Sequence, residues 1–93
     1  MRKQEYYEEF PSADELRIRH LTVDEALPLI VRFLHDSYRD GFTQVKIIHG
    51  KGTGMMRETV RREMKRHPLV KSFRAGGRDE GGEGVTVVEF SEK

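Results

Sequence analysis

A stripe of apolar residues at helical spacing, flanked by short segments with strand patterns, constrains the fold of this chain most strongly. Apolar side chains stand at positions 23, 26, 27, 30, 33, 34 and 38, a spacing that places them on one helix face. Thr22 and Glu25 have capping-box spacing, and Gly41 predicts the end of the helix. Pro28 removes one backbone donor, so we expect a kink or an irregular first turn there.

Strand patterns and a second helix surround this segment. The strands are predicted at residues 16–21, 44–49, 69–75 and 85–90, and the second helix at residues 55–67. Residues 76–84 hold five glycines and are expected to form a mobile loop. The resulting order is βαβαββ, with the last two strands as an antiparallel pair. It predicts an α/β two-layer sandwich with a four-stranded mixed sheet and two main helices.

Composition excludes several classes of protein. The 93 residues suffice for one domain, and the absence of cysteine excludes disulfides and thiol catalysis. The four histidines are scattered, and no apolar run approaches the length of a membrane span. We therefore expect a cytoplasmic protein without membrane partners. Residues 1–14 form an acidic arm that we expect to be loosely held, and residues 15–93 form the domain.

The formal net charge of +1 hides an uneven distribution of charge along the chain. Residues 1–15 carry a net charge of −3, whereas residues 51–78 carry nine basic and two acidic side chains, a net charge of +7. An excess of this size favours a polyanionic partner. The alternative is an ordinary solvated basic face, and composition does not separate the two.

A glycine-rich loop follows the second strand and leads into the second helix. Its candidate binding residues are Gly50, Lys51, Gly52, Thr53 and Gly54, with Arg57 and Arg61 one turn apart on the helix. Backbone amides at a helix start suit a phosphate, and a lysine adds charge. The spacing matches neither the Walker A loop nor the dinucleotide-binding motif. A simple tight turn remains the alternative, but the basic segment downstream favours a phosphate-binding loop.

His49 at the head of this loop is the candidate catalytic residue, because an imidazole suits general acid–base work near neutral pH. The alternative is a histidine that only satisfies backbone groups at a strand end. Glu58 and Glu63 stand among arginines and are expected to form helix ion pairs. No acidic spacing is typical of a two-metal site, so no metal site is predicted.

Several of these motifs together resemble the Smr (small MutS-related) domain. The matching segments are HGKGTG after an apolar strand, then MMRETVRREMKRHPLVKSF, then GGEGVTVVEF, and the resemblance covers residues 16–90. It is closest to the C-terminal domain of the second class of bacterial MutS-like proteins. The resemblance implies a fold like that of the C-terminal domain of the third bacterial translation initiation factor. It also implies binding of branched or structured nucleic acid, and endonuclease activity in some members.

The first strand departs from the family pattern. The family motif L-D-L-[HR]-G reads Leu16, Arg17, Ile18, Arg19, His20 here. In the nuclease members, the acid of this motif and the residue after the second leucine are those usually assigned to cleavage. Arg17 neither accepts a proton nor holds a metal ion, although Arg17 and Arg19 can both bind phosphate.

Three functions are compatible with these residues. The first is a module that binds structured or branched DNA or RNA through phosphates, in repair, recombination or ribosome rescue, with the ribosome as a candidate partner. The second is an active endonuclease that nicks DNA or cleaves RNA, with His49 as acid or base. The third is a nucleotide-binding domain that uses the same loop. Binding requires no cofactor, whereas a nuclease could use a divalent metal ion.

Overall fold

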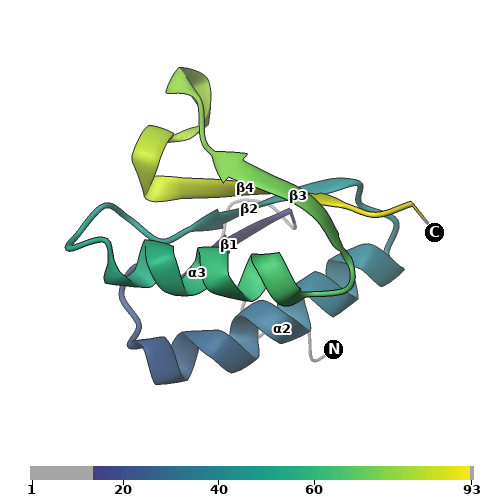
Figure 1. Ribbon diagram of the computed structural model, residues 1–93, viewed down its shortest axis with the longest axis horizontal. Helices are drawn as coiled ribbons and strands as arrows, with labels where there is room; N and C mark the ends of the chain where they lie inside the picture. Colours follow the sequence, from purple (N-terminus) through teal and green to yellow (C-terminus); the bar gives the residue numbers. More distant parts are fainter. Residues whose placement is uncertain (1–13, 93) are drawn as a thin grey trace.

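The computed structural model describes residues 14–92, which form one sheet and two helices (Figure 1). The strands are β1 (Glu15–Arg17), β2 (Gln44–Ile48), β3 (Val70–Ala75) and β4 (Val85–Phe90). The helices are α2 (Val23–Arg39) and α3 (Met55–Arg66). The expected N-terminal arm falls almost entirely outside the described residues. Neither helix is long and apolar enough to cross a membrane.

The sheet has the order β1-β2-β4-β3. β1 and β2 are parallel, whereas β4 runs antiparallel to both of its neighbours, β2 and β3. The predicted mixed sheet and the antiparallel pairing of the last two strands are therefore confirmed. The last strand of the chain lies in the interior of the sheet, between two strands that precede it.

The first strand is shorter than residues 16–21. The amide of Ile18 still donates to the carbonyl of Ile48 at 2.9 Å, but the chain then turns, and the amide of Leu21 donates back to the carbonyl of Ile18 at 3.0 Å. This turn allows Thr22 to begin α2. The side chain of Thr22 accepts from the amide of Glu25, and the Glu25 carboxylate accepts from the amide of Thr22, which confirms the predicted capping box. The helix continues through Pro28, whose ring is exposed.

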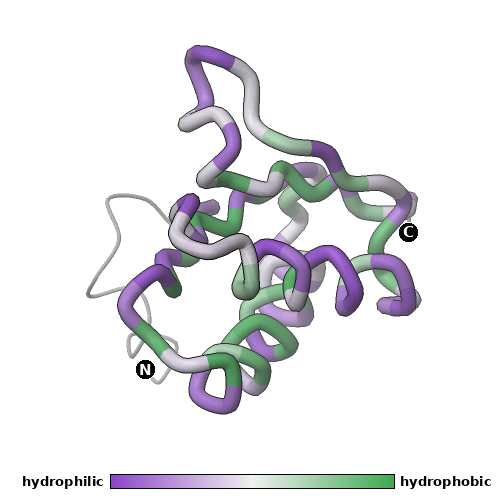
Figure 2. The backbone as a smooth tube through the Cα atoms, turned by 60° about the vertical axis from the view of Figure 1, so that its left-hand side comes forward, coloured by the Kyte–Doolittle hydropathy of each residue, from purple (hydrophilic) through white to green (hydrophobic). Residues whose placement is uncertain are grey.

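Both helices cover the same face of the sheet, which gives the predicted two layers (Figure 1). The core between them contains Leu16 and Ile18 of the first strand segment, Phe33 and Leu34 of α2, and Val60 of α3, all fully buried. Coloured by hydropathy, α3 is mostly hydrophilic, whereas the central strands are mostly hydrophobic (Figure 2). α3 therefore contributes a narrow apolar line to the core and carries basic side chains on the rest of its surface.

The glycine-rich segment between β3 and β4 has more order than its composition indicates. It contains two short 3-10 turns, Arg78–Glu80 and Gly82–Gly84. The Arg74 guanidinium donates two hydrogen bonds to the Glu80 carboxylate, at 2.7 and 3.0 Å, and the amide of Gly77 donates to the same group at 2.8 Å. These charge-assisted bonds fold the segment back onto the end of β3.

Candidate nucleic-acid interface

The loop between β2 and α3 is built on three glycines with positive φ. The φ angles are 78° at Gly50, 41° at Gly52 and 91° at Gly54. Other residues rarely adopt such angles, so each glycine is required by the backbone of the loop. The amide of Gly54 donates to the carbonyl of Lys51 at 3.0 Å and closes the turn. The side chains of Lys51 and Thr53 are exposed on this turn.

The second glycine-rich segment supports the first. The carbonyl of Gly84 accepts from the amides of His49 and Gly50, at 3.0 and 2.9 Å. A side chain at Gly84 would bring a Cβ atom to 3.3 Å from the Cα of Gly50, which is closer than an ordinary contact. The two glycine motifs, more than thirty residues apart in sequence, thus form one packed unit.

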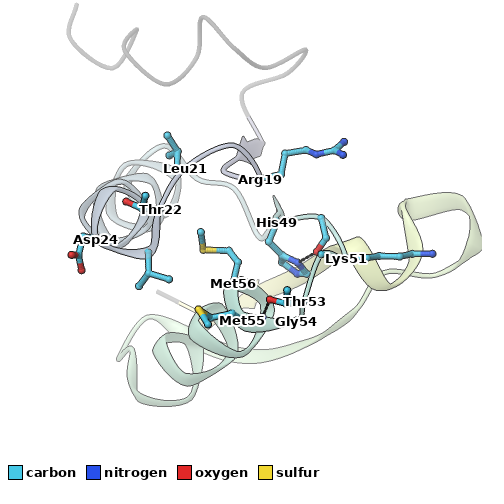
Figure 3. Close-up of a pocket in the computed structure, with 13 residues that line it drawn as sticks. Arg19, Leu21, Thr22, Asp24, His49, Lys51, Thr53, Gly54, Met55 and Met56 are labelled. Atoms are coloured by element: carbon cyan, nitrogen blue, oxygen red, sulfur yellow. Dashed lines mark hydrogen bonds between the residues drawn. The ribbon is translucent and has the colours of Figure 1, made fainter.

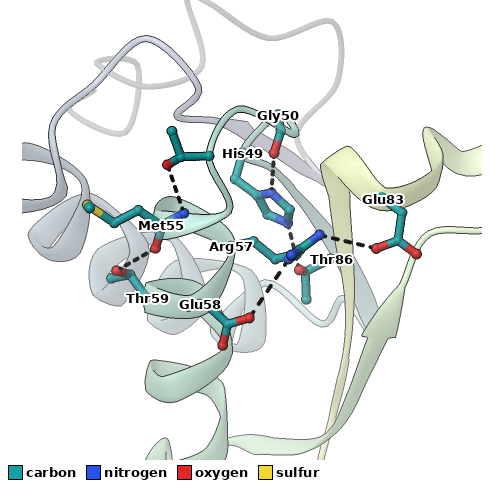
Figure 4. A network of polar contacts seen from close by, with 9 residues as sticks. His49, Gly50, Met55, Arg57, Glu58, Thr59, Glu83 and Thr86 are labelled. Atoms are coloured by element: carbon teal, nitrogen blue, oxygen red, sulfur yellow. Dashed lines mark hydrogen bonds and ion pairs between the residues drawn. The ribbon is translucent and has the colours of Figure 1, made fainter.

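His49 lies inside this unit and is only 4% exposed. Its Nδ1 atom lies 2.9 Å from the carbonyl of Gly50 and its Nε2 atom 2.8 Å from the Thr86 hydroxyl (Figure 4). Since a carbonyl only accepts, Nδ1 carries the proton, and in the neutral ring Nε2 accepts from Thr86. Burial lowers the pKa of His49 below its usual range, and the charges of Arg57 and Arg61 lower it further.

This environment defines what His49 does in the structure. The neutral imidazole bridges the glycine loop and β4, so it holds the loop in place. A role as general base would require Nε2 to give up the Thr86 hydroxyl and to gain access to a substrate.

The N-cap residue of α3 offers no side chain to cap the helix. Its N-cap residue is Gly54, whereas α2 has a complete capping box. The Thr53 hydroxyl accepts from the amide of Met55 at 3.3 Å, which satisfies one donor of the first turn. The positive end of the helix dipole therefore lies at the loop that carries Lys51.

A cavity of about 490 Å³ lies between this loop and the chain that leads from β1 into α2 (Figure 3). Its lining consists of Arg19, residues 21–24 and residues 49–56. Seven of the predicted site residues line it: Arg19, His49, Gly50, Lys51, Gly52, Thr53 and Gly54. The cavity gathers the loop and one cation of the first strand segment into a single site.

The other three predicted residues lie outside this cavity. Leu16 and Ile18 face the helices, so Arg17 between them faces the opposite side of the sheet. Arg57 lines a neighbouring hollow and is 29% exposed, and it pairs with Glu83 at 3.4 Å and with Glu58 at 4.0 Å (Figure 4).

Arg61 lies one turn further along α3, and its Nε atom is buried without a hydrogen-bond partner in the described part of the chain. Several basic side chains of the predicted positive segment are paired with acids. Arg57 pairs with Glu83, Arg66 with Glu63 and Arg74 with Glu80, so less positive charge is free than the sequence indicates. The predicted helix ion pairs of Glu58 and Glu63 are present. Within residues 14–92, Lys51 has no such acidic partner.

Sequence reasoning missed two kinds of residue. One is the support for the loop, the carbonyl of Gly84 and the hydroxyl of Thr86, although both belong to the recognised GGEGVTVVEF motif. The other is the apolar part of the cavity lining, which includes Leu21, Val23 and Met56. Their apolar spacing indicated only a core.

The donor set gives no support to a metal site. Among residues 14–92, no three histidine, aspartate or glutamate side chains gather closely enough to hold a metal ion. The cavity itself contains Asp24 and His49, and both ring nitrogens of His49 are engaged. We therefore assign no chemistry in this site to a protein-bound metal ion.

Comparison with known proteins establishes the family. The model of the Smr domain matches residues 16–91, and the chain belongs to this family. Among relatives, the protein called endonuclease MutS2 of Caldicellulosiruptor saccharolyticus is 52% identical over 73 residues, which are 78% of this chain and 9% of that protein. The protein of the same name from Listeria monocytogenes is 45% identical over 80 residues, which are 86% of this chain and 10% of that protein. The chain thus spans about a tenth of the length of these curated relatives.

Solved structures agree on the fold. The Smr domain of Thermus thermophilus MutS2 superimposes with a TM-score of 0.82 at 38% identity, covering 85% of this chain and 99% of that one. YdaL, a stand-alone small MutS-related protein of Escherichia coli, superimposes with a TM-score of 0.83 at 23% identity, covering 97% of this chain and 74% of that one. The mixed four-stranded sheet with two helices is the fold of the family.

Proposed function

We propose that this Smr domain binds the phosphate backbone of structured or branched DNA or RNA at its glycine loop. The observation that carries the proposal is the position of Lys51. It is exposed on a loop of three positive-φ glycines, at the start of α3, whose N-cap residue is a glycine, and it lines a cavity together with Arg19. A helix start and two cations that line one cavity suit a phosphate. Arg57, Arg61 and Arg17 extend this contact less directly, because they lie outside the cavity.

Fluorescence anisotropy with a structured RNA and a branched DNA, each at two salt concentrations, tests this proposal. Lys51→Ala is expected to weaken binding and to reduce the slope of log affinity against log salt by about 0.7–0.9, the loss of one phosphate contact. Lys71→Ala is the matched control, since Lys71 is also exposed but lies near the opposite end of the sheet. Unchanged affinity and an unchanged salt slope in Lys51→Ala would show that the loop does not take part in binding.

The preferred probe also indicates the biological context. A preference for branched DNA would favour a role in repair or recombination, and a preference for structured RNA a role at the ribosome. We propose that the domain acts in the cytoplasm, where both kinds of nucleic acid occur.

An endonuclease is the second candidate, because the MutS2 relatives are called endonucleases. His49 would be the acid or base, and the loop amides with Lys51 would stabilise the transition state. Arg17 stands where the family motif has an acid, and it faces the side of the sheet opposite the helices. Product on a denaturing gel that disappears in His49→Ala, with binding retained, would support cleavage, and chelator would show whether a metal ion takes part. Binding without product under all conditions would leave the domain a binding module.

A further inference from the structure

One half of the cavity is apolar, which phosphate binding does not require. Leu21 and Val23, before and at the start of α2, line it together with Met55 and Met56 of α3. Met55 is 67% exposed and Val31 36%, and these two are the exposed large hydrophobic side chains of residues 14–92. A single exposed apolar residue is ordinary, but Met55 lies at a cavity and beside a cationic loop.

The other half of the cavity is cationic. In Figure 3 the side chains of Arg19 and Lys51 extend in the same direction, away from α2, whereas Met55 and Met56 lie nearer to the helix. Arg19 packs closely against the loop, since a Cβ atom at Gly50 would lie 3.3 Å from the Cβ of Arg19. The cavity therefore has a charged side that suits phosphate and an apolar side that suits an apolar group of the same ligand.

We propose that the apolar half accepts one unstacked nucleobase whose adjoining phosphates lie on Lys51 and Arg19. This inference rests on the proposed function and specifies its substrate class: nucleic acid with at least one unpaired nucleotide, such as a bulge, a gap or a branch point. A fully paired duplex offers phosphates to the loop but no free base to the cavity.

The size and chemistry of the cavity fit such an occupant. Its volume of about 490 Å³ falls within the range of roughly 300–1,000 Å³ that is usual for small-ligand sites. Methionine side chains are flexible and polarisable, and they pack favourably against flat aromatic rings. Thr22 and Asp24 also line this side, and in Figure 3 the Asp24 carboxylate lies on the side of α2 away from the loop.

Two probes of equal length test the inference. One is a duplex with a single unpaired 2-aminopurine, and the other is the same duplex fully paired. Wild type should bind the bulged probe about fivefold more tightly, as expected for the burial of part of a methionine side chain. The fluorescence of 2-aminopurine should also rise on binding, because the base leaves the stack.

Met55→Ala should abolish the preference for the bulged probe without disturbing the fold, since alanine is well tolerated at the start of a helix. Val31→Ala is the matched control, because it shortens the other exposed apolar side chain, on α2 and outside the cavity, and it should keep the preference. Equal affinity of wild type for both probes, or a preference that survives Met55→Ala, would overturn the inference while phosphate binding stands. Absence of binding to either probe would instead overturn the proposed function.

Discussion

His49 and Thr86 lie 37 residues apart in sequence and share a hydrogen bond of 2.8 Å between the imidazole Nε2 and the threonine hydroxyl. This bond joins the end of β2 to the interior strand β4, directly beneath the glycine loop. Because both groups are buried, the loss of either leaves a polar atom without a partner.

Thr86→Val is expected to lower the free energy of unfolding by about 1–3 kcal/mol, because it keeps the shape of the side chain but leaves the His49 Nε2 atom unsatisfied. Urea denaturation measures the change. Thr43→Val, at an exposed threonine before β2, should stay within about 0.5 kcal/mol. Equal stability of the two variants would show that the bond contributes nothing to the fold.

Stability should fall as the pH drops below about 6.5, the value for an unfolded histidine. Burial lowers the pKa of both His49 and His67 in the folded protein. Below pH 6.5 the unfolded chain therefore binds protons that the folded chain does not, and stability is lost until the folded pKa values are reached. Urea denaturation at several pH values measures this, and NMR titration should place the His49 transition below the usual range. A transition of His49 at or above 6.5 would contradict the neutral, buried imidazole.

Gly84→Ala should weaken nucleic-acid binding and reduce stability by about 1 kcal/mol, because the added Cβ atom presses on the backbone of Gly50. Gly77→Ala is a suitable control, since its Cβ atom would meet only the flexible end of Glu80 and its φ of −81° suits alanine. Circular dichroism and anisotropy measure the two effects. Binding at the wild-type level in Gly84→Ala would show that the loop does not depend on β4.

Glu80 should titrate far below an ordinary glutamate. Hydrogen bonds from the Arg74 side chain and, to a smaller extent, the Gly77 amide lower its pKa to about 2. In Arg74→Ala the pKa should return toward about 4.3, whereas Arg78→Ala, in the same turn, should leave it low. Titration of the Glu80 carboxyl carbon by NMR separates these cases. A pKa near 4.3 in the wild type would mean that the Arg74–Glu80 pair does not persist in solution.

The helices and most strand positions could be predicted because their signals are local. Thr22, Glu25 and the apolar stripe lie within one segment, and a capping box needs no distant residue. The end of β1 could not be predicted, since it depends on where β2 ceases to offer a partner, at the carbonyl of Ile48. Pro28 predicts a local disturbance of α2, and the helix nevertheless extends past it to Arg39, because tertiary packing of the apolar stripe outweighs one lost backbone bond.

The site could be predicted in part for a similar reason. The glycine loop is contiguous, so its residues were recognisable together. The pairing of Arg57 with Glu83 joins residues 26 apart, and periodicity on the helix cannot reveal it. Arg17 and Arg19 looked equivalent in sequence, yet strand alternation and the following turn place only Arg19 at the cavity. The sequence does not predict the apolar wall of the cavity, because Leu21, Val23 and Met56 fit the pattern of core residues equally well.

Because β4 is an interior strand, the loop between β2 and α3 can fold only after β4 has been synthesised. Every residue of the HGKGTG motif is present once residue 54 has been made, but the amides of His49 and Gly50 have no acceptor until the carbonyl of Gly84 arrives. In the folded sheet β4 lies between β2 and β3, so these two strands are not hydrogen-bonded to each other. A nascent or truncated chain that ends before this strand would carry the complete motif and still lack the folded loop. The loop that we propose as the binding site therefore depends on the last strand of the sheet for its folded form.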